Sequence, residues 1–300
     1  MNNEVKKVSI GLIGLGAMGR GAAINLIKHN FEVIGFDIRK ESLDWLKEQG
    51  GVPVSSIAQL AEKVKIIISF VVNSEQTESV LYGDSGLIEK LTKDSVVIAC
   101  STMDPAYVQN LCARMSKDGV VLIDAPVTGG ASGAMKGTLT IMGSGDPATF
   151  EIARPVLEAF GSNVYYLGAA GAGAKMKVLN QLLCGVHLAA AGEALAMAKQ
   201  QGLPLSTTLE ILNKGAANSW MLSDRGPRMI SENFDNPASA VDIFVKDMSL
   251  VLDAARKNKF PAHLAHAAYL AFIEASARGF GAMDDSAVTF MARACPCFRL

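Results

Sequence analysis

A glycine motif near the N-terminus places the strongest constraint on the fold. Gly14, Gly16 and Gly19 form the pattern G-x-G-x-x-G, directly after the apolar run VSIGLI and at the start of the helical pattern AMGRGAAINLIKHN. In this context the first glycine allows a tight turn, the second lets the backbone approach a pyrophosphate, and the third allows close packing of helix on strand. The motif therefore predicts a βαβ unit that binds a dinucleotide at the helix N-terminus.

An acidic residue at the end of the next strand indicates which dinucleotide. Asp37 closes the run FEVIGFD, 18 positions after Gly19. A carboxylate there accepts hydrogen bonds from ribose hydroxyls and repels a 2′-phosphate, so we predict NAD rather than NADP. Arg39 offers a counter-cation that moderates this preference, and a glycine-rich turn without a ligand is the alternative. The predicted cofactor contacts are Gly14, Leu15, Gly16, Ala17, Met18, Gly19, Asp37, Val72, Asn73 and Thr102.

Strand-like and helical patterns alternate through the first half of the chain. The strand-like runs are VSIGLIG, FEVIGFD, VKIIISFVV, SVVIACS, VVLIDAP, LTIMGSG and NVYYLG. This rhythm predicts an α/β Rossmann domain over residues 1–168, and the near-continuous Val, Ile and Leu predict a doubly wound, mostly parallel sheet covered by helices on both faces. Ligands of such sheets bind at the carboxyl ends of strands, which selects Val72, Asn73 and Thr102. For Asn73 and Ser101, helix capping or turn chemistry is an equal alternative.

The second part of the chain has a purely helical pattern. One long helix is predicted over about residues 173–201, ended by Gly202 with Pro204 just beyond. Residues 206–290 show helical periodicity without a strand pattern. Because 300 residues exceed the usual size of one core, we expect a second, all-helical domain over residues 169–300, joined to the first by the long helix and serving substrate binding and oligomerisation.

Composition excludes several classes of partner. The 28 basic and 29 acidic residues give a net charge of -1, so no uniform field would attract nucleic acid or an anionic membrane. Half of the residues are apolar, yet no uninterrupted apolar run reaches the roughly 18 residues of a membrane span. This excess of apolar residues predicts a subunit interface, in a homodimer or homotetramer. The N-terminus lacks a signal-peptide pattern, which predicts a cytoplasmic protein.

The cysteine and histidine spacings do not match a metal site. Five cysteines are present, and their one close pair is a C-x-C near the C-terminus. We expect reduced structural thiols and no bound metal. The cysteines are Cys100, Cys112, Cys184, Cys295 and Cys297.

A lysine in the long helix is the candidate for proton transfer. Lys177 lies three residues before Asn180 in the segment GAAGAGAKMKVLNQ, so both side chains share one helix face. A lysine amine, with an ordinary pKa of about 10.4, accepts a proton near neutral pH only when desolvation or a neighbouring cation lowers that pKa. We predict that Lys177 is a general acid or base. The alternative is a surface lysine whose stem covers apolar side chains.

A second glycine-rich loop is a candidate anion site. Thr128, Gly129 and Gly130 follow the strand pattern VVLIDAP. Adjacent glycines let backbone N–H groups point into a cleft as a nest for a carboxylate, with the Thr128 hydroxyl as a further donor. We predict a small carboxylic acid as substrate, with a flexible surface turn as the alternative.

Nearly the whole chain resembles the β-hydroxyacid dehydrogenase family, to which 3-hydroxyisobutyrate dehydrogenase belongs. The segments that carry the resemblance are GLGAMGRGAAINL, DAPVTGGASGAMKGTLTIMGSG, GAGAKMKVLNQ and FVKDMSLV. The resemblance implies a Rossmann domain followed by a helical domain, with Lys177 catalytic, residues 128–130 and Asn180 on the substrate, and Lys246 on the cofactor. For Lys246, a solvated ion pair with Asp247 is the alternative.

The resemblance also implies the activity. It implies NAD-dependent oxidation of a small hydroxy acid, with a lysine as general acid or base. The segments NQLLCGVHLAAAGEALAMA, NSWML, AVDIFVKD and DDSAV favour L-threonate, oxidised to its 2-oxo acid. Oxidation of 3-hydroxyisobutyrate and reduction of tartronate semialdehyde are the alternatives. A non-catalytic NAD-binding sensor is the alternative from a different class, and such a protein need not keep Lys177 together with the glycine loop.

Overall fold

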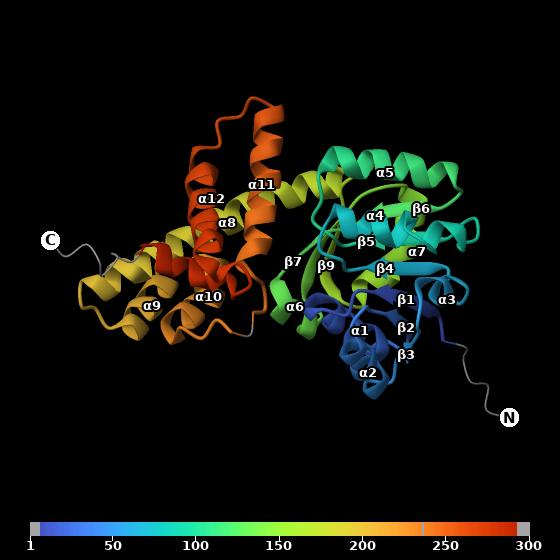
Figure 1. Ribbon diagram of the computed structural model, residues 1–300, viewed down its shortest axis with the longest axis horizontal. Coiled ribbons are helices and arrows are strands. Elements are labelled where there is room, and N and C mark those ends of the chain that lie inside the picture. The colour runs from blue at the N-terminus through green and yellow to red at the C-terminus, as the bar shows by residue number, and fades with distance from the viewer. Residues whose placement is uncertain (1–6, 236, 293–300) are drawn as a thin grey trace. The chain divides into compact units, whose positions relative to one another are not determined.

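The computed structural model describes residues 7–235 and 237–292, and the chain folds into two compact units, Met1–Lys177 and Val178–Leu300 (Figure 1). The first unit contains β1 (Ser9–Ile13), α1 (Ala17–Lys28), β2 (Glu32–Phe36), α2 (Lys40–Glu48), β3 (Val52–Pro53), α3 (Ile57–Ala61), β4 (Ile66–Ser69), α4 (Ser74–Tyr82), η1 (Leu87–Glu89), β5 (Val96–Ala99), α5 (Pro105–Lys117), β6 (Val121–Asp124), β7 (Val127–Thr128), α6 (Gly130–Lys136), β8 (Leu139–Gly143), α7 (Pro147–Glu158) and β9 (Gly161–Tyr166).

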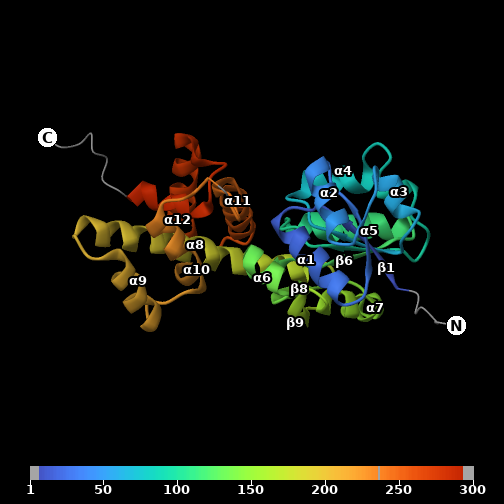
Figure 2. The same ribbon diagram turned by 90° about the horizontal axis from the view of Figure 1, so that it is seen from below.

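The first unit is built on a six-stranded sheet in the order β3-β2-β1-β4-β5-β6, with every neighbouring pair parallel. Successive strand residues are buried on opposite faces. In β5, Ile98 packs in one core with α1 and α7, while Val97 packs in the other with α3, α4 and α5. In Figure 2, α3, α4 and α5 lie on one side of this sheet and α7 on the other. The predicted doubly wound α/β fold is confirmed.

The last two predicted strands do not extend this sheet. Instead, β7, β8 and β9 form a separate three-stranded sheet, in which β7 pairs antiparallel with β8 and β8 pairs parallel with β9. The two-residue strands β3 and β7 were not predicted, because a run so short carries no periodicity. The runs LTIMGSG and NVYYLG thus form strands, but in a small sheet of their own beside the large parallel one.

The long helix is α8 (Ala172–Gln200), within one residue of the predicted bounds. Its first six residues belong to the first unit and the rest to the second. By length and composition alone α8 could cross a membrane, although the sequence predicted no span. In its most apolar window 44% of the residues are buried within the protein, and the core helix of a water-soluble protein meets the same criterion.

The regular elements of the second unit are all helices among its described residues, as predicted. It contains the remainder of α8 and α9 (Leu205–Lys214), α10 (Trp220–Ser231), α11 (Val241–Lys257), α12 (His263–Ala275), the π-helical turn η2 (Ser276–Phe280) and the 3₁₀ segment η3 (Asp285–Ala292). Its core includes Leu188 of α8, Val241 of α11 and Phe272 of α12, all fully buried. Phe272 stacks on Phe244 with ring centroids 5.0 Å apart.

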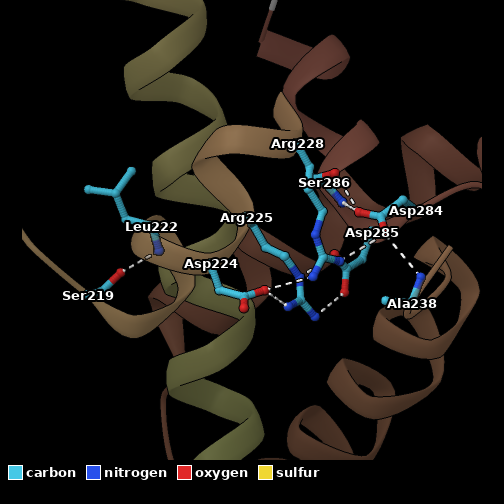
Figure 3. A network of polar contacts seen from close by, with 9 residues as sticks. All are labelled: Ser219, Leu222, Asp224, Arg225, Arg228, Ala238, Asp284, Asp285 and Ser286. Atoms are coloured by element: carbon cyan, nitrogen blue, oxygen red, sulfur yellow. Dashed lines mark hydrogen bonds and ion pairs between the residues drawn. The ribbon is translucent and has the colours of Figure 1, made fainter. Parts of the chain in front are cut away.

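Two arginines of α10 bind the segment that begins η3 (Figure 3). Arg225 donates from Nε and Nη2 to the two carboxylate oxygens of Asp285, at 2.8 and 3.0 Å, and the Asp285 side chain is fully buried. Arg228 donates to Asp284 at 3.0 Å, and both arginines also bind Asp224. Because the buried charges are paired in bidentate geometry, this network fixes α10 against η3.

Candidate active site

The glycine turn after β1 has the geometry of a dinucleotide cradle. Gly14 has φ +87°, and an added Cβ would lie 2.7 Å from the Phe70 carbonyl oxygen. A Cβ on Gly19 would lie 1.8 Å from the Gly14 oxygen, so both positions require glycine. A Cβ on Gly16 would meet only the Arg39 guanidinium, at 3.8 Å, which leaves the backbone open on that side. The turn fits a pyrophosphate at the N-terminus of α1.

The other predicted residues of this turn differ in exposure. The Leu15 side chain is fully buried and Met18 packs against the core, so either residue can contact a cofactor mainly through its backbone. Ala17 is exposed as the first residue of α1.

Asp37 lies at the carboxyl end of β2, beside the glycine turn. Its Oδ2 accepts the Leu15 backbone N–H at 2.7 Å. Arg39 donates to the same carboxylate from its backbone and from two guanidinium nitrogens, at 2.9 to 3.0 Å. Burial acts to raise the pKa of Asp37, but the hydrogen bonds from Arg39 and Leu15 outweigh it and hold the pKa below its ordinary value. The carboxylate is thus ionised and Arg39 is its direct partner.

The ends of β4 and β5 lie at the same edge of the sheet. Ser101 Oγ donates to the Val71 carbonyl at 2.7 Å, which ties the two strand ends together. The Asn73 side-chain oxygen accepts the Gln76 N–H at 2.9 Å and caps α4. For both residues the structural alternative of the sequence analysis is therefore present. Val72 is exposed beside them and Thr102 is half-buried.

The loop after β7 adopts a backbone that only glycine accepts readily. Gly129 has φ +123° and Gly130 has φ +63°. A Cβ on Gly129 would also lie 3.2 Å from the Leu139 side chain. Thr128, the last residue of β7, is half-buried and is held in the small sheet opposite Thr140. The loop is therefore a defined turn between a strand and α6.

Lys177 lies against this loop. Its side chain is buried, and Nζ donates to the carbonyl oxygen of Val127 at 2.8 Å, one residue before Thr128. Lys175, two residues earlier on α8, is exposed. The amine predicted to transfer a proton is thus next to the loop predicted to bind the carboxylate.

The remaining predicted residues belong to the second unit and form a polar cluster there. Asn180 donates to Gln181 at 2.8 Å, and Gln181 Nε2 donates to Asp247 at 2.5 Å. Lys246 Nζ lies 2.9 Å from the other Asp247 oxygen. The ion pair offered as an alternative is therefore present, with Asp247 buried and the Lys246 side chain 25% exposed. Gln181 was not among the predicted site residues, and its hydrogen bond to Asp247 links α8 to α11.

Two buried residues of the first unit were missed by the sequence analysis. Asp124, the last residue of β6, and Ser144, just after β8, are both fully buried. Asp124 Oδ2 accepts the backbone N–H of Ala174 at 2.8 Å and the Ser144 hydroxyl at 3.0 Å. Burial raises the pKa of Asp124 to about 6. The sequence did carry a signal for Asp124, because a charged residue there ends an otherwise apolar strand pattern.

Another residue that was not predicted links the two helices that follow the glycine loops. Asn25 of α1 is buried and donates from Nδ2 to the carbonyl oxygen of Ala134 on α6, at 2.8 Å. A Cβ on Gly21 would lie 2.4 Å from the Ala134 backbone. The helix that follows the dinucleotide turn is thus locked directly to the helix that follows the substrate loop.

Among the described residues, neither the thiols nor a cluster of metal ligands adds further chemistry. Burial, with a contribution from the Asp124 charge, raises the pKa of Cys112 to about 12 and raises that of Cys100 as well. Both thiols are therefore protonated at neutral pH. Cys295 and Cys297 lie outside the described residues. Within residues 7–235 and 237–292, no three His, Cys, Asp or Glu side chains are grouped to hold a metal.

Two family models match the chain in succession. Residues 9–168 match the NAD binding domain of 6-phosphogluconate dehydrogenase. Residues 171–291 match the model described as NAD-binding of NADP-dependent 3-hydroxyisobutyrate dehydrogenase. The glycine turn and Asp37 thus fall within a recognised NAD-binding domain.

Individual relatives match over almost the whole chain. L-threonate dehydrogenase of Cupriavidus necator is 44% identical, with 93% of this chain and 94% of the relative aligned. L-threonate dehydrogenase of Haemophilus influenzae is 40% identical, with 95% of each chain aligned. The crystal structure of 3-hydroxyisobutyrate dehydrogenase from Salmonella typhimurium superposes with a TM-score of 0.91 at 38% identity, covering 95% of this chain and 100% of that one. The chain therefore belongs to the β-hydroxyacid dehydrogenase family and is an NAD-binding oxidoreductase.

Proposed function

We propose that this protein oxidises L-threonate to its 2-oxo acid, with Lys177 as the general base. The observation that carries the proposal is the position of the Lys177 amine, buried and 2.8 Å from the Val127 carbonyl, beside the loop of Thr128, Gly129 and Gly130. Relatives at 40 and 44% identity are named L-threonate dehydrogenase, which supports this substrate among small hydroxy acids.

Each residue has a distinct task in this proposal. Backbone N–H groups of Gly129 and Gly130, with the Thr128 hydroxyl, would hold the substrate carboxylate. The Val127 carbonyl fixes the amine of Lys177, which in its neutral form takes the proton of the substrate hydroxyl and in the reverse direction returns it. Asn180, one turn along α8, would orient the substrate.

The cofactor would be held by the glycine turn, by Asp37 and by the strand ends at Val72, Asn73 and Thr102. NAD, when bound, supplies the hydride acceptor. We propose that residues 1–168 form the NAD-binding domain, that residues 169–300 serve substrate binding and oligomerisation, and that Lys246 contacts the cofactor.

Changing Lys177 to Met tests the mechanism, since it keeps an unbranched side chain and removes the amine. We expect turnover with L-threonate to fall about 10²- to 10⁴-fold, the usual contribution of a general base, while the Kd for NAD stays within twofold. Lys175→Met is the matched control, because Lys175 is exposed on the same helix. Unchanged turnover in Lys177→Met would overturn the mechanism, and no turnover with any hydroxy acid in the parent protein would favour an NAD-binding sensor.

Comparing substrates tests the narrower assignment. Formation of NADH with L-threonate, 3-hydroxyisobutyrate and glycerate, and consumption of NADH with tartronate semialdehyde, can be followed by absorbance. We expect the highest kcat/KM with L-threonate. A higher value with 3-hydroxyisobutyrate would reject L-threonate and retain the dehydrogenase mechanism.

We further propose a cytoplasmic homodimer or homotetramer. Large apolar side chains are exposed on the second unit, among them Leu179 and Leu183 of α8 and Leu264 and Leu270 of α12. Such side chains are typical of a subunit interface. A monomeric mass by light scattering of the intact protein would reject this assembly.

A further inference from the structure

The first two turns of α8 are tied to one strand segment by two separate contacts. Asp124 binds the N–H of Ala174, and Val127 binds the amine of Lys177. In each contact the two residues are 50 positions apart in the sequence. Moving three residues along the strand segment, from Asp124 to Val127, therefore matches moving three residues along α8, from Ala174 to Lys177. Any shift of the helix relative to Asp124 would therefore also displace the Lys177 amine from Val127.

Asp124 is held from several sides where it meets the helix. Its backbone exchanges two hydrogen bonds with Ser144, at 2.7 and 3.0 Å. The Ser144 hydroxyl donates to Asp124 Oδ2 and accepts the N–H of Gly173 at 3.0 Å. These contacts join the end of β6 in the large sheet, the residue after β8 in the small sheet, and the N-terminus of α8. The carboxylate and hydroxyl thus satisfy two N–H groups that the first turn of a helix cannot pair internally.

The close approach is built into the sequence. A Cβ on Gly173 would lie 2.2 Å from the Met142 carbonyl oxygen and 3.0 Å from Asp124 Oδ2, so only glycine lets the helix dock this deeply. The other oxygen, Asp124 Oδ1, is buried with no hydrogen-bond partner among the described residues. An aspartate with one unsatisfied oxygen is costly in a buried position. Capping the N-terminus of α8 uses only Oδ2, so capping alone does not explain why the whole Asp124 side chain is buried.

We propose that Asp124, acting with Ser144, is a positioning residue that sets the depth and rotation of the first turn of α8 and so holds the Lys177 amine at the substrate loop. The proposal rests on the proposed role of Lys177 for its effect on turnover. Its structural part stands independently of that role. Asp124 is not placed in contact with the substrate.

The structural part is tested by the reactivity of the Lys177 amine. In Asp124→Ala we expect Lys177 to be acetylated by acetic anhydride several-fold faster than in the parent protein, measured by mass spectrometry, because the amine is no longer held at Val127. Exposed Lys175 is the internal reference and should be unchanged. An unchanged rate at Lys177 would overturn the proposal, whatever the kinetics show.

The consequence is tested by kinetics. A displacement of about 1 Å in a reacting group can lower the rate about 100-fold, so we expect kcat of Asp124→Ala to fall about 10- to 100-fold while the Kd for NAD stays within twofold. Asp124→Asn keeps an acceptor for Ala174 and Ser144 and should restore kcat to within about threefold of the parent. If Asp124→Asn is as impaired as Asp124→Ala, positioning is rejected.

Three further variants separate the possible failures. Ser144→Ala keeps the carboxylate, is the milder change if Asp124→Ala does not fold, and should also lower kcat. Ser69→Ala is the control for Ser144→Ala, because it removes a buried hydroxyl at the end of β4 that has no hydrogen-bond partner among the described residues. In a Lys177→Met background the Asp124→Ala change should have no additional effect on turnover. Additive losses would reject the proposal for Asp124, whereas full activity of Lys177→Met alone would reject the proposed function.

Discussion

At the residue scale, Asp37 illustrates how one carboxylate can be shared between protein and cofactor. Its oxygens already accept hydrogen bonds from Leu15 and Arg39. Ribose hydroxyls would have to share this carboxylate, and a 2′-phosphate would meet Asp37 and Arg39 together. The structure thus makes Arg39 as relevant to cofactor choice as Asp37.

Changing these two residues should affect the two cofactors in opposite ways. In Asp37→Ala we expect KM for NAD to rise about tenfold or more, since a hydrogen bond to a charged group contributes about 1.5–3 kcal/mol, and the preference for NAD over NADP to fall. Arg39→Ala should instead raise KM for NADP more than KM for NAD. Steady-state kinetics with both cofactors measures this. Equal effects of both variants on both cofactors would contradict the assignment.

The glycine motif and Asp37 were predictable because their spacing along a βαβ unit fixes their geometry. The burial of Asp124 was not, because it depends on Ser144 and Ala174, which are distant in sequence. For Asn73 the sequence left helix capping and cofactor contact as equal alternatives, and only the structure shows that its side-chain oxygen caps α4.

At the element scale, apolar runs predicted the strands of the large sheet but not their partners. The runs LTIMGSG and NVYYLG resemble the earlier ones, yet they form β8 and β9, which pair with each other in a separate sheet whose third strand, β7, pairs with β8. Asp124 bridges Ser144, and β7 pairs with β8 in the same antiparallel register, so the chain runs on from β6 into β7 and leaves the large sheet there. A two-residue strand gives no periodic signal of this change of partner. The ends of α8 were predictable to within one residue, because glycine and proline mark its C-terminus.

The ion-pair network of α10 and η3 supplies an element-scale prediction (Figure 3). Asp285→Ala would leave Arg225 buried with only Asp224 as a charged partner among the contacts described, and removing one member of a buried pair typically destabilises by about 3–5 kcal/mol. We expect a loss of this order in the free energy of unfolding of the second unit.

Trp220 begins α10, in the second unit, and Trp45 belongs to α2, in the first, so a Trp45→Phe background lets tryptophan fluorescence report the second unit alone during urea unfolding. Glu210→Ala is the control, because the Glu210–Lys214 pair is exposed and should contribute at most about 0.5 kcal/mol. A loss for Asp285→Ala as small as that of the control would contradict a structural role for the network.

At the scale of the whole molecule, the acid–base behaviour of the first unit should depend on Asp124. Burial disfavours the charged form of this carboxyl and raises the pKa of Asp124 from an ordinary value of 3.8 to about 6. The thiols whose pKa its charge helps to raise, Cys100 and Cys112, remain protonated throughout this range. The carboxyl of Asp124 is therefore the group of this cluster that titrates between pH 4 and pH 6.

The sign of its effect on stability follows from proton binding. Between pH 3.8 and about 6 the folded protein keeps the Asp124 proton while the unfolded chain loses it. The stabilisation by the protonated form is complete below pH 3.8 and is lost as pH rises towards 6, a change of about 3 kcal/mol for a shift of about two units. In a Trp220→Phe background, where Trp45 fluorescence reports the first unit, urea unfolding at pH 4 and pH 7 measures the change. As the pH is raised from 4 to 7, Asp124→Asn should gain stability relative to the parent, because its amide does not titrate. If the difference in unfolding free energy between the two proteins stays constant with pH, Asp124 ionises at its ordinary pKa despite its burial.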